Sequence, residues 1–155
     1  LNYREHKKAI NPPRYENTIA MAMELPNGKF VTGRSSRRMV AGAALILNAI
    51  KILSGYEDDH FLISDEVLHT MQHLKTDMLH KSTGSLTLEE ALTSLAISAS
   101  SDPSAALALE KLSHLRGCRA HCTAILSDRD AQVFHDLGID VTCEAEFSSN
   151  SLYTG

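Results

Sequence analysis

The sequence lacks several features that would assign it to a well-known class of protein. Its longest apolar run, at 39–53, is interrupted by Asn48 and Lys51 and is shorter than the roughly 20 residues that a membrane span needs. Positive charge is not in excess, because the net charge is −4. No Walker or dinucleotide-binding motif, Gly-x-Ser-x-Gly elbow or His-Glu-x-x-His pair is present. We therefore expect neither a membrane protein nor a nucleic-acid binder. The sequence also carries no common motif that would indicate a particular activity.

Cysteine is scarce as well. The chain has three cysteines and no signal-peptide pattern at its start, so free thiols in a reducing, cytoplasmic compartment are the simplest interpretation. Cys118, His121, Cys122 and Cys143 have a spacing that resembles a zinc site. On a strand, however, His121 faces away from Cys118 and Cys122, and three ligands cannot converge. We expect buried structural cysteines, with no metal and no cofactor.

The length and composition are those of one domain. The chain has 155 residues, of which 43% are hydrophobic and 22% are charged, and this is enough to bury a core. Residues 1–17 are polar and are split by Pro12-Pro13, which predicts a linker from a missing upstream domain. Residues 18–155 are predicted to form one α/β domain, with 56–116 as a helical insertion.

The elements follow in an order typical of an α/β fold on the border of α+β. Asn27-Gly28 between two apolar runs predicts antiparallel strands at 18–25 and 29–33, the first of them central and buried on both faces. A buried helix should then run from the following loop to Gly55. A strand–helix–strand unit near the end requires a parallel pair, so we expect a small mixed sheet of about four strands. The remaining elements are predicted as helices at 64–79, 87–98, 102–117 and 127–138 and strands at 118–126 and 139–144.

Two polar loops follow predicted strands, and each opens a helix. Ligands of such sheets bind at the carboxyl ends of parallel strands, near helix N-termini. Free backbone N–H groups, the helix dipole, hydroxyls and guanidinium groups all favour an anion such as phosphate or carboxylate. The predicted ligand-binding residues are Thr32, Gly33, Arg34, Ser35, Ser36 and Arg37 in the first loop and Ser127 and Arg129 in the second.

Each loop also has a structural interpretation. Ser35 or Ser36 can serve only as a cap of the following helix, with the arginines forming a solvated surface. Asp128 and Asp130 beside Arg34 could act as an acid–base or metal-binding pair, and they are the candidate catalytic residues. Alternatively, Asp128 caps its helix and Asp130 lies in the first turn, where the helix dipole favours a carboxylate.

Short motifs are spread along most of the chain. They are Leu25-Pro26-Asn27-Gly28-Lys29, Val31-Thr32-Gly33, Leu45-Ile46-Leu47-Asn48-Ala49, Leu62-Ile63-Ser64, Leu95-Ala96-Ile97-Ser98-Ala99, Gly117-Cys118-x-Ala120-His121, Ile125-Leu126-Ser127, Leu137-Gly138, Thr142-Cys143-Glu144 and Leu152-Tyr153. Together and in this order they resemble the C-terminal part of a bacterial family called domain of unknown function 1846. The resemblance covers the chain from about residue 19 to residue 153.

The resemblance implies a larger protein and a fold. Full-length members look like proteins with an N-terminal, nucleotide-binding-like α/β domain, which would be a partner of this one. The C-terminal part is similar in topology to cytidine deaminases, with the helical stretch as an insertion. Zinc deaminases bind metal through His-x-Glu and Pro-Cys-x-x-Cys motifs, whereas the corresponding Arg34-Ser35-Ser36 and Ser127-Asp128-Arg129 carry no such ligands. We therefore do not expect a zinc deaminase, and nothing here supports the ATP-dependent peptidase label sometimes given to the family.

Two functions stay open, and the residues do not decide whether the protein is an enzyme. In the first, the domain contributes an anion-binding loop to a site shared with the N-terminal domain and binds a phosphate-bearing small molecule. In the second, it is a non-catalytic oligomerisation or docking module. Ala- and Leu-rich helices, such as residues 105–115, would then form a homo-oligomer.

Overall fold

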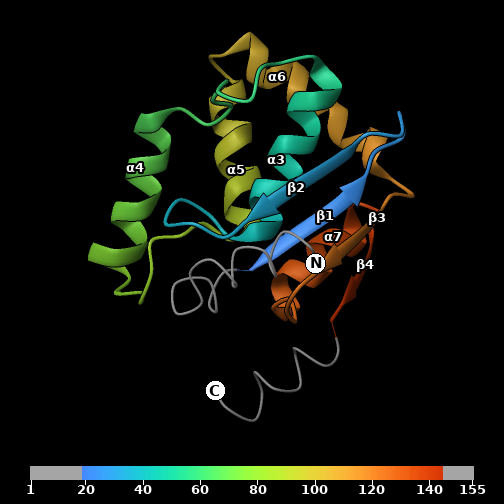
Figure 1. The fold of residues 1–155 in the computed structure, drawn as a ribbon. Coiled ribbons are helices and arrows are strands. Elements are labelled where there is room, and N and C mark those ends of the chain that lie inside the picture. The colour runs from blue at the N-terminus through green and yellow to red at the C-terminus, as the bar shows by residue number, and fades with distance from the viewer. Residues whose placement is uncertain (1–18, 145–155) are drawn as a thin grey trace.

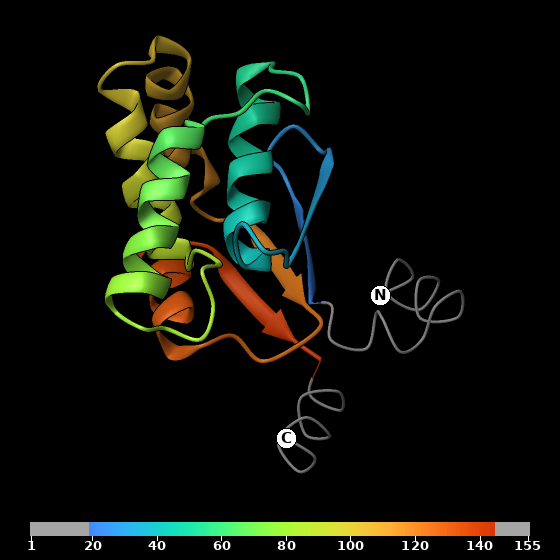
Figure 2. The same ribbon diagram turned by 90° about the vertical axis from the view of Figure 1, so that its left-hand side faces the viewer.

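The computed structural model describes residues 19–144 and shows one mixed sheet with helices on a single side of it (Figure 1, Figure 2). The strands are β1 (Ala20–Glu24), β2 (Phe30–Arg34), β3 (Arg119–Cys122) and β4 (Asp140–Cys143). The helices are α3 (Ala41–Ser54), α4 (Asp65–His73), α5 (Leu88–Ala99), α6 (Pro103–Glu110) and α7 (Asp128–Asp136), with a π-helical turn η1 (Leu74–Met78) and a 3₁₀ turn η2 (Lys111–Leu115).

The strand order is β2-β1-β3-β4. Strand β1 is antiparallel to both β2 and β3, and β3 is parallel to β4. Three strands therefore run in one direction, and β2, β3 and β4 all end at the edge of the sheet where β1 begins. This confirms the predicted mixed sheet of about four strands, while the likeness to deaminases stays a prediction.

Within residues 19–144, helices cover only one face of the sheet. Along β1, the side chains of Met21 and Met23 are buried, whereas Ala20 and Ala22 on the other face are half-buried. The prediction that this strand is buried on both faces is therefore wrong, although it is central. The prediction was based on the apolar composition of the strand, and it failed because alanine is small enough to be tolerated on a partly exposed face.

Helix α3 forms the centre of the core between the sheet and the other helices. Its side chains Leu45, Ile46 and Ile50 are fully buried. The helix backbone comes very close to β2 at Gly33, where an added Cβ would lie 2.3 Å from the Leu45 nitrogen and 2.8 Å from the Ala41 oxygen. The packing of α3 on the sheet thus requires a residue without a side chain at this position.

The start of α3 differs from the prediction. Its N-cap is Val40, without a side-chain hydrogen bond, so neither Ser35 nor Ser36 caps this helix. The chain first makes an isolated parallel bridge between Met39 and Leu86, and the Val40 N–H donates to the Leu86 carbonyl. This long-range pairing holds residues 35–40 outside the helix.

The other helices begin where the sequence predicts, although Ser127 rather than Asp128 caps α7, and several helices end differently. The hydroxyls of Ser64 and Ser127 and the carboxylate of Asp102 accept from first-turn N–H groups, and Thr87 forms a complete capping box with Glu90. The second predicted helix ends in the π-helical turn and the fourth in the 3₁₀ turn. Strand β3 is shorter than predicted because β1 begins at Ala20, which leaves no partner beyond Thr123.

The contact at Gly33 gives a first testable prediction. Gly33→Ala should lower the free energy of unfolding by about 2–3 kcal/mol or more, because the new methyl group meets helix backbone that cannot move aside. Gly84→Ala is the matched control, since its methyl group would meet only side-chain carbons of Thr76 and Gln72, at 3.3 Å or more. Urea unfolding of both variants measures the difference, and equal stabilities would contradict the proposed constraint.

Candidate functional site

Three surface hollows are lined by some of the residues that the sequence singles out. The first, the sheet-face hollow, has a volume of about 300 Å³ and lies on the face of the sheet that carries no helix. Alanines of β1 form its floor, and longer side chains of β2 and β3 stand at its sides. Its lining includes Ala20, Ala22, Thr32, Arg34, Asn48 and His121.

His121 is the most unusual group in the sheet-face hollow. Its Nδ1 atom lies 2.9 Å from the Thr142 hydroxyl on β4. Its Nε2 atom is buried and has no hydrogen-bond partner among residues 19–144. A buried polar atom without a partner costs free energy, so the His121 ring is held here at some cost by its packing and by the contact with Thr142. The sequence predicts that His121 and Cys122 face opposite sides of the sheet, and the alternating burial along β3 confirms this.

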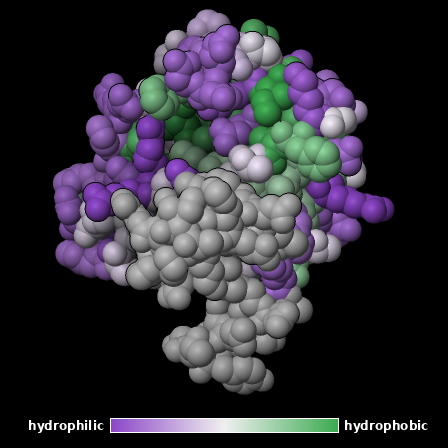
Figure 3. Space-filling model, in the orientation of Figure 1, coloured by the Kyte–Doolittle hydropathy of each residue, from purple (hydrophilic) through white to green (hydrophobic). Residues whose placement is uncertain are grey.

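The second hollow, called the Arg38 hollow, lies on the α4 side of α3 and has a volume of about 170 Å³. Ser36 and Arg38 border it from the loop after β2, and Lys51 borders it from α3. In the space-filling view, apolar surface lies at the bottom of a depression between α4 and α3 and is edged by polar residues (Figure 3). The apolar lining includes Leu47, Leu62 and Ile63.

The third hollow contains Asp128 and lies between α7 and β4. Arg34, Ser36 and Asp128 therefore border three different hollows, and the structure does not bring the two predicted loops together around one ligand. Ser127 and Arg129 are exposed beside Asp128. The prediction that these loops bind a ligand stays a prediction.

The serines of the first loop have structural partners. The Ser35 hydroxyl accepts from the Ile19 N–H at 3.1 Å. The Ser36 hydroxyl accepts from the N–H groups of Arg38 and Met39 and therefore shapes a turn in the loop. Arg37 is exposed, and its carbonyl accepts from the Gln72 amide.

Asp130 has a structural role that links two helices. Its carboxylate is 6% exposed, and Oδ1 accepts from the Leu88 N–H at the start of α5, at 3.1 Å. Burial raises the pKa of Asp130 above its ordinary value, although this hydrogen bond opposes the shift. Asp130 thus caps a helix other than its own, which the sequence did not indicate.

An ion pair between buried Lys75 and half-buried Glu90 lies next to this cap. The Lys75 ammonium group donates to Glu90 Oε1 at 2.7 Å and to the Ser85 carbonyl at 2.6 Å, and the lysine is only 6% exposed. Burial raises the pKa of the Glu90 carboxyl, but hydrogen bonds from Lys75 and Thr87 outweigh burial and hold this pKa below its ordinary value. Sequence reasoning missed Lys75, although it follows buried Leu68 by seven residues on the same helical face.

The hydrogen bond between the Asp130 carboxylate and the Leu88 N–H predicts different results for two substitutions. Asp130→Asn keeps the acceptor and removes a buried charge, so the free energy of unfolding at pH 7 should stay within about 1 kcal/mol or rise. Asp130→Ala leaves the Leu88 N–H without its acceptor and should cost about 1–2 kcal/mol. Because the folded-state pKa is raised, Asp130 contributes less stability as pH rises through that pKa, and the asparagine variant should lose this dependence. Unfolding curves between about pH 3 and about pH 8, a range that begins below the ordinary carboxyl pKa values, test both statements.

The ion pair generates a further prediction. Lys75→Ala should lower the free energy of unfolding by about 1–3 kcal/mol near neutral pH, because it leaves the Glu90 carboxylate, whose side chain is 30% exposed, without its partner. The lowered pKa of Glu90 means that its stabilising contribution is present above the unfolded-state pKa and is lost as pH falls through the folded-state pKa. The variant should therefore show a flatter acid limb. Lys81→Ala, at an exposed lysine nearby, is the control and should behave like the unaltered chain.

The described part of the chain contains no group of three or more His, Cys, Asp or Glu side chains placed to hold a metal ion. None of the helices within 19–144 is both long and apolar enough to cross a membrane. All three cysteines are free thiols, with Cys118 and Cys122 buried.

These features define a small α/β domain in which the described helices cover one face of a four-stranded sheet. The chain belongs to the family described as domain of unknown function DUF1846, C-terminal, whose model matches residues 2–153. The family resemblance predicted from the sequence is thereby confirmed.

Curated relatives give the same assignment. The chain is 45% identical over 155 residues to a UPF0371 protein of Clostridium botulinum (strain Eklund 17B) and covers 31% of that protein. It is 44% identical over 152 residues to a UPF0371 protein of Clostridium tetani, of which it covers 30%. A UPF0371 protein of Clostridioides difficile is 47% identical over 133 residues, or 26% of its length. The chain thus spans about a third of the length of these relatives, and in each the alignment takes in at least 86% of this chain.

Proposed function

We propose that this domain is a docking module, and that the helix-free face of its sheet binds the part of the longer polypeptide that precedes it. The observation that carries the proposal is the one-sided sheet. Parallel strand pairs are usually covered on both faces, yet the outer face of β3 and β4 has no helix on it among the described residues.

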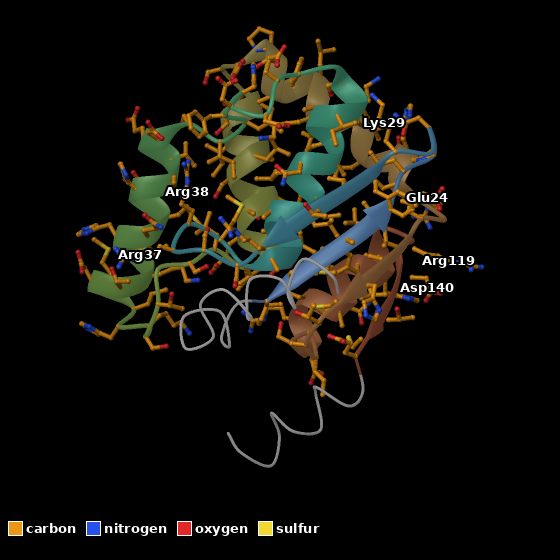
Figure 4. All side chains as sticks on the ribbon, viewed as in Figure 1. Glu24, Lys29, Arg37, Arg38, Arg119 and Asp140 are labelled. Carbon is orange, nitrogen blue, oxygen red and sulfur yellow. The ribbon has the colours of Figure 1, made fainter. Side chains whose placement is uncertain are left out.

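The composition of this face supports an interface with a polar partner. Small residues of β1 line the sheet-face hollow together with the longer polar side chains of Thr32 and Arg34. At the far end of the sheet, Glu24, Arg119 and Asp140 gather side by side (Figure 4). Such a mixture of small, polar and charged side chains is typical of interfaces between parts that are not one continuous core.

The path of the chain also supports this occupant. Strand β1 begins in the middle of the sheet, and its first residue, Ala20, lies opposite Arg34 at the end of β2. The described part of the chain therefore begins beside the sheet-face hollow. Relatives are about three times as long as this chain, and the family model is that of a C-terminal domain. A cytoplasmic location, suggested by the free thiols, belongs to the same proposal.

Cysteine labelling tests the docking proposal. Thr32→Cys would place a thiol on the open face and Ser113→Cys a control thiol on η2, both at exposed positions and both in a Cys143→Ser background. Burial raises the pKa values of the Cys118 and Cys122 thiols, which therefore react slowly. In a full-length family member carrying this domain, the thiol of Thr32→Cys should react much more slowly than that of Ser113→Cys.

The same labelling in the 155-residue chain provides the comparison. There, both engineered thiols should react readily if the preceding polypeptide is the occupant. Equal reactivity in the full-length protein would contradict the proposal. Protection of Thr32→Cys in the short chain, together with a dimeric mass by light scattering, would instead assign the face to a second copy and overturn the proposed occupant.

A second candidate function is the binding of a small anion beside the loop after β2. The specific observation that favours it is that Ser36, one of the predicted ligand-binding residues, shares the Arg38 hollow with the cations of Arg38 and Lys51. This candidate keeps the anion-binding part of the sequence prediction but moves it away from Arg34 and Ser127.

A further inference from the structure

The Arg38 hollow combines two kinds of lining. Its charged part is made by Arg38 and Lys51, with the Ser36 hydroxyl at the same mouth. Its apolar part is made by Leu47, Leu62 and neighbouring aliphatic side chains of α3 and of the segment before α4. A pocket with an apolar floor and a few polar groups at one end is the usual form of a small-molecule site.

Contacts in and beside the hollow hold the cations in place. The Arg38 guanidinium lies over the Phe61 ring, 4.9 Å from its centroid, and such stacking orients a guanidinium. The Lys51 ammonium group donates to the Asp58 carbonyl at 2.7 Å, which leaves its other hydrogens for further acceptors. Arg38 also lies 4.0 Å from exposed Asp65, a separation at which an exposed ion pair contributes little.

The two cations repel each other. Burial lowers the pKa of Lys51, Asp58 and Asp59 oppose this shift, and the positive charge of Arg38 lowers the pKa further. The residues lining the hollow include no carboxylate, so an anion placed between the cations would relieve this repulsion. The Ser36 hydroxyl could donate to it as well, because its present contact with the Met39 carbonyl is long, at 3.5 Å.

We propose that the Arg38 hollow binds a small amphipathic anion, with a phosphate or carboxylate head between Arg38 and Lys51 and a short apolar body against Leu47 and Leu62. The inference rests on the second candidate function and names its ligand class. The volume of about 170 Å³ suits a small body, such as one ring or a short acyl chain. The bidentate geometry of a guanidinium suits both kinds of head group.

Phenyl phosphate is a probe of this class, and its binding can be followed by amide chemical shifts in the 155-residue chain. It should shift resonances of residues 36–39 and 61–63. Inorganic phosphate and benzyl alcohol, which carry only the head or only the body, should each bind at least about tenfold more weakly. Arg38→Ala should weaken phenyl phosphate at least about tenfold.

Two further variants make the test specific. Arg37→Ala removes the exposed neighbouring arginine, which does not line the hollow (Figure 4), and should change binding by no more than about twofold. Ala44→Leu fills the hollow and keeps both cations, so it should abolish preference for phenyl phosphate over phosphate. Thermal unfolding confirms that each variant is folded before its binding is compared.

The outcomes separate the inference from the function on which it rests. Equal binding of phosphate and phenyl phosphate at residues 36–39 would keep an anion site and overturn the amphipathic class. Equal losses in Arg37→Ala and Arg38→Ala would show unspecific attraction to surface charge and overturn the site. Absence of shifts with every anion, in a folded chain, would overturn both the inference and the second candidate function.

Discussion

The close approach of α3 to the sheet is the constraint on which the rest of this structure depends. At Gly33 the helix backbone lies where a side chain of β2 would otherwise stand. At Gly42, near the start of the same helix, an added Cβ would lie 2.9 Å from the Phe134 ring of α7. Two residues without side chains thus bring α3 close to β2 and α7. The fully buried Leu45, Ile46 and Ile50 of α3 then fill the narrow space between the helical layer and the sheet.

Local chemistry predicted much of this fold. Serine, threonine and aspartate caps bond to N–H groups two or three residues away, so a short window of sequence contains all the information that a helix start needs. The path from β2 to α3 could not be predicted in this way. It depends on pairing between Met39 and Leu86, which are 47 positions apart in the sequence. The open face of β1 escaped prediction because burial of alternate alanines is set by what covers the sheet.

The candidate sites also combine features that a short window of sequence predicts with features that depend on residues far apart in the sequence. Serine, glycine and arginine after a strand are expected in an anion-binding loop, but they are equally expected in a turn, which is how Ser36 is used here. The partners that turn Arg38 into part of a hollow, Lys51 and Phe61, come from α3 and the segment before α4. Asp130 looked like a candidate catalytic acid because it stands beside Asp128. Its role as a cap became visible only with α5 in place.

The two proposed surfaces meet at one residue. Asn48 lines both the sheet-face hollow and the Arg38 hollow, and its amide donates to the Thr32 carbonyl at 2.9 Å. A polypeptide docked on the open face would therefore border a side chain that also forms a wall of the anion hollow. Ligand pockets are common where two domains meet, because each domain supplies part of the wall. The docking proposal and the anion proposal thus describe neighbouring parts of one boundary, and the position of Asn48 makes the loop after β2 the place where a partner and a ligand would affect each other.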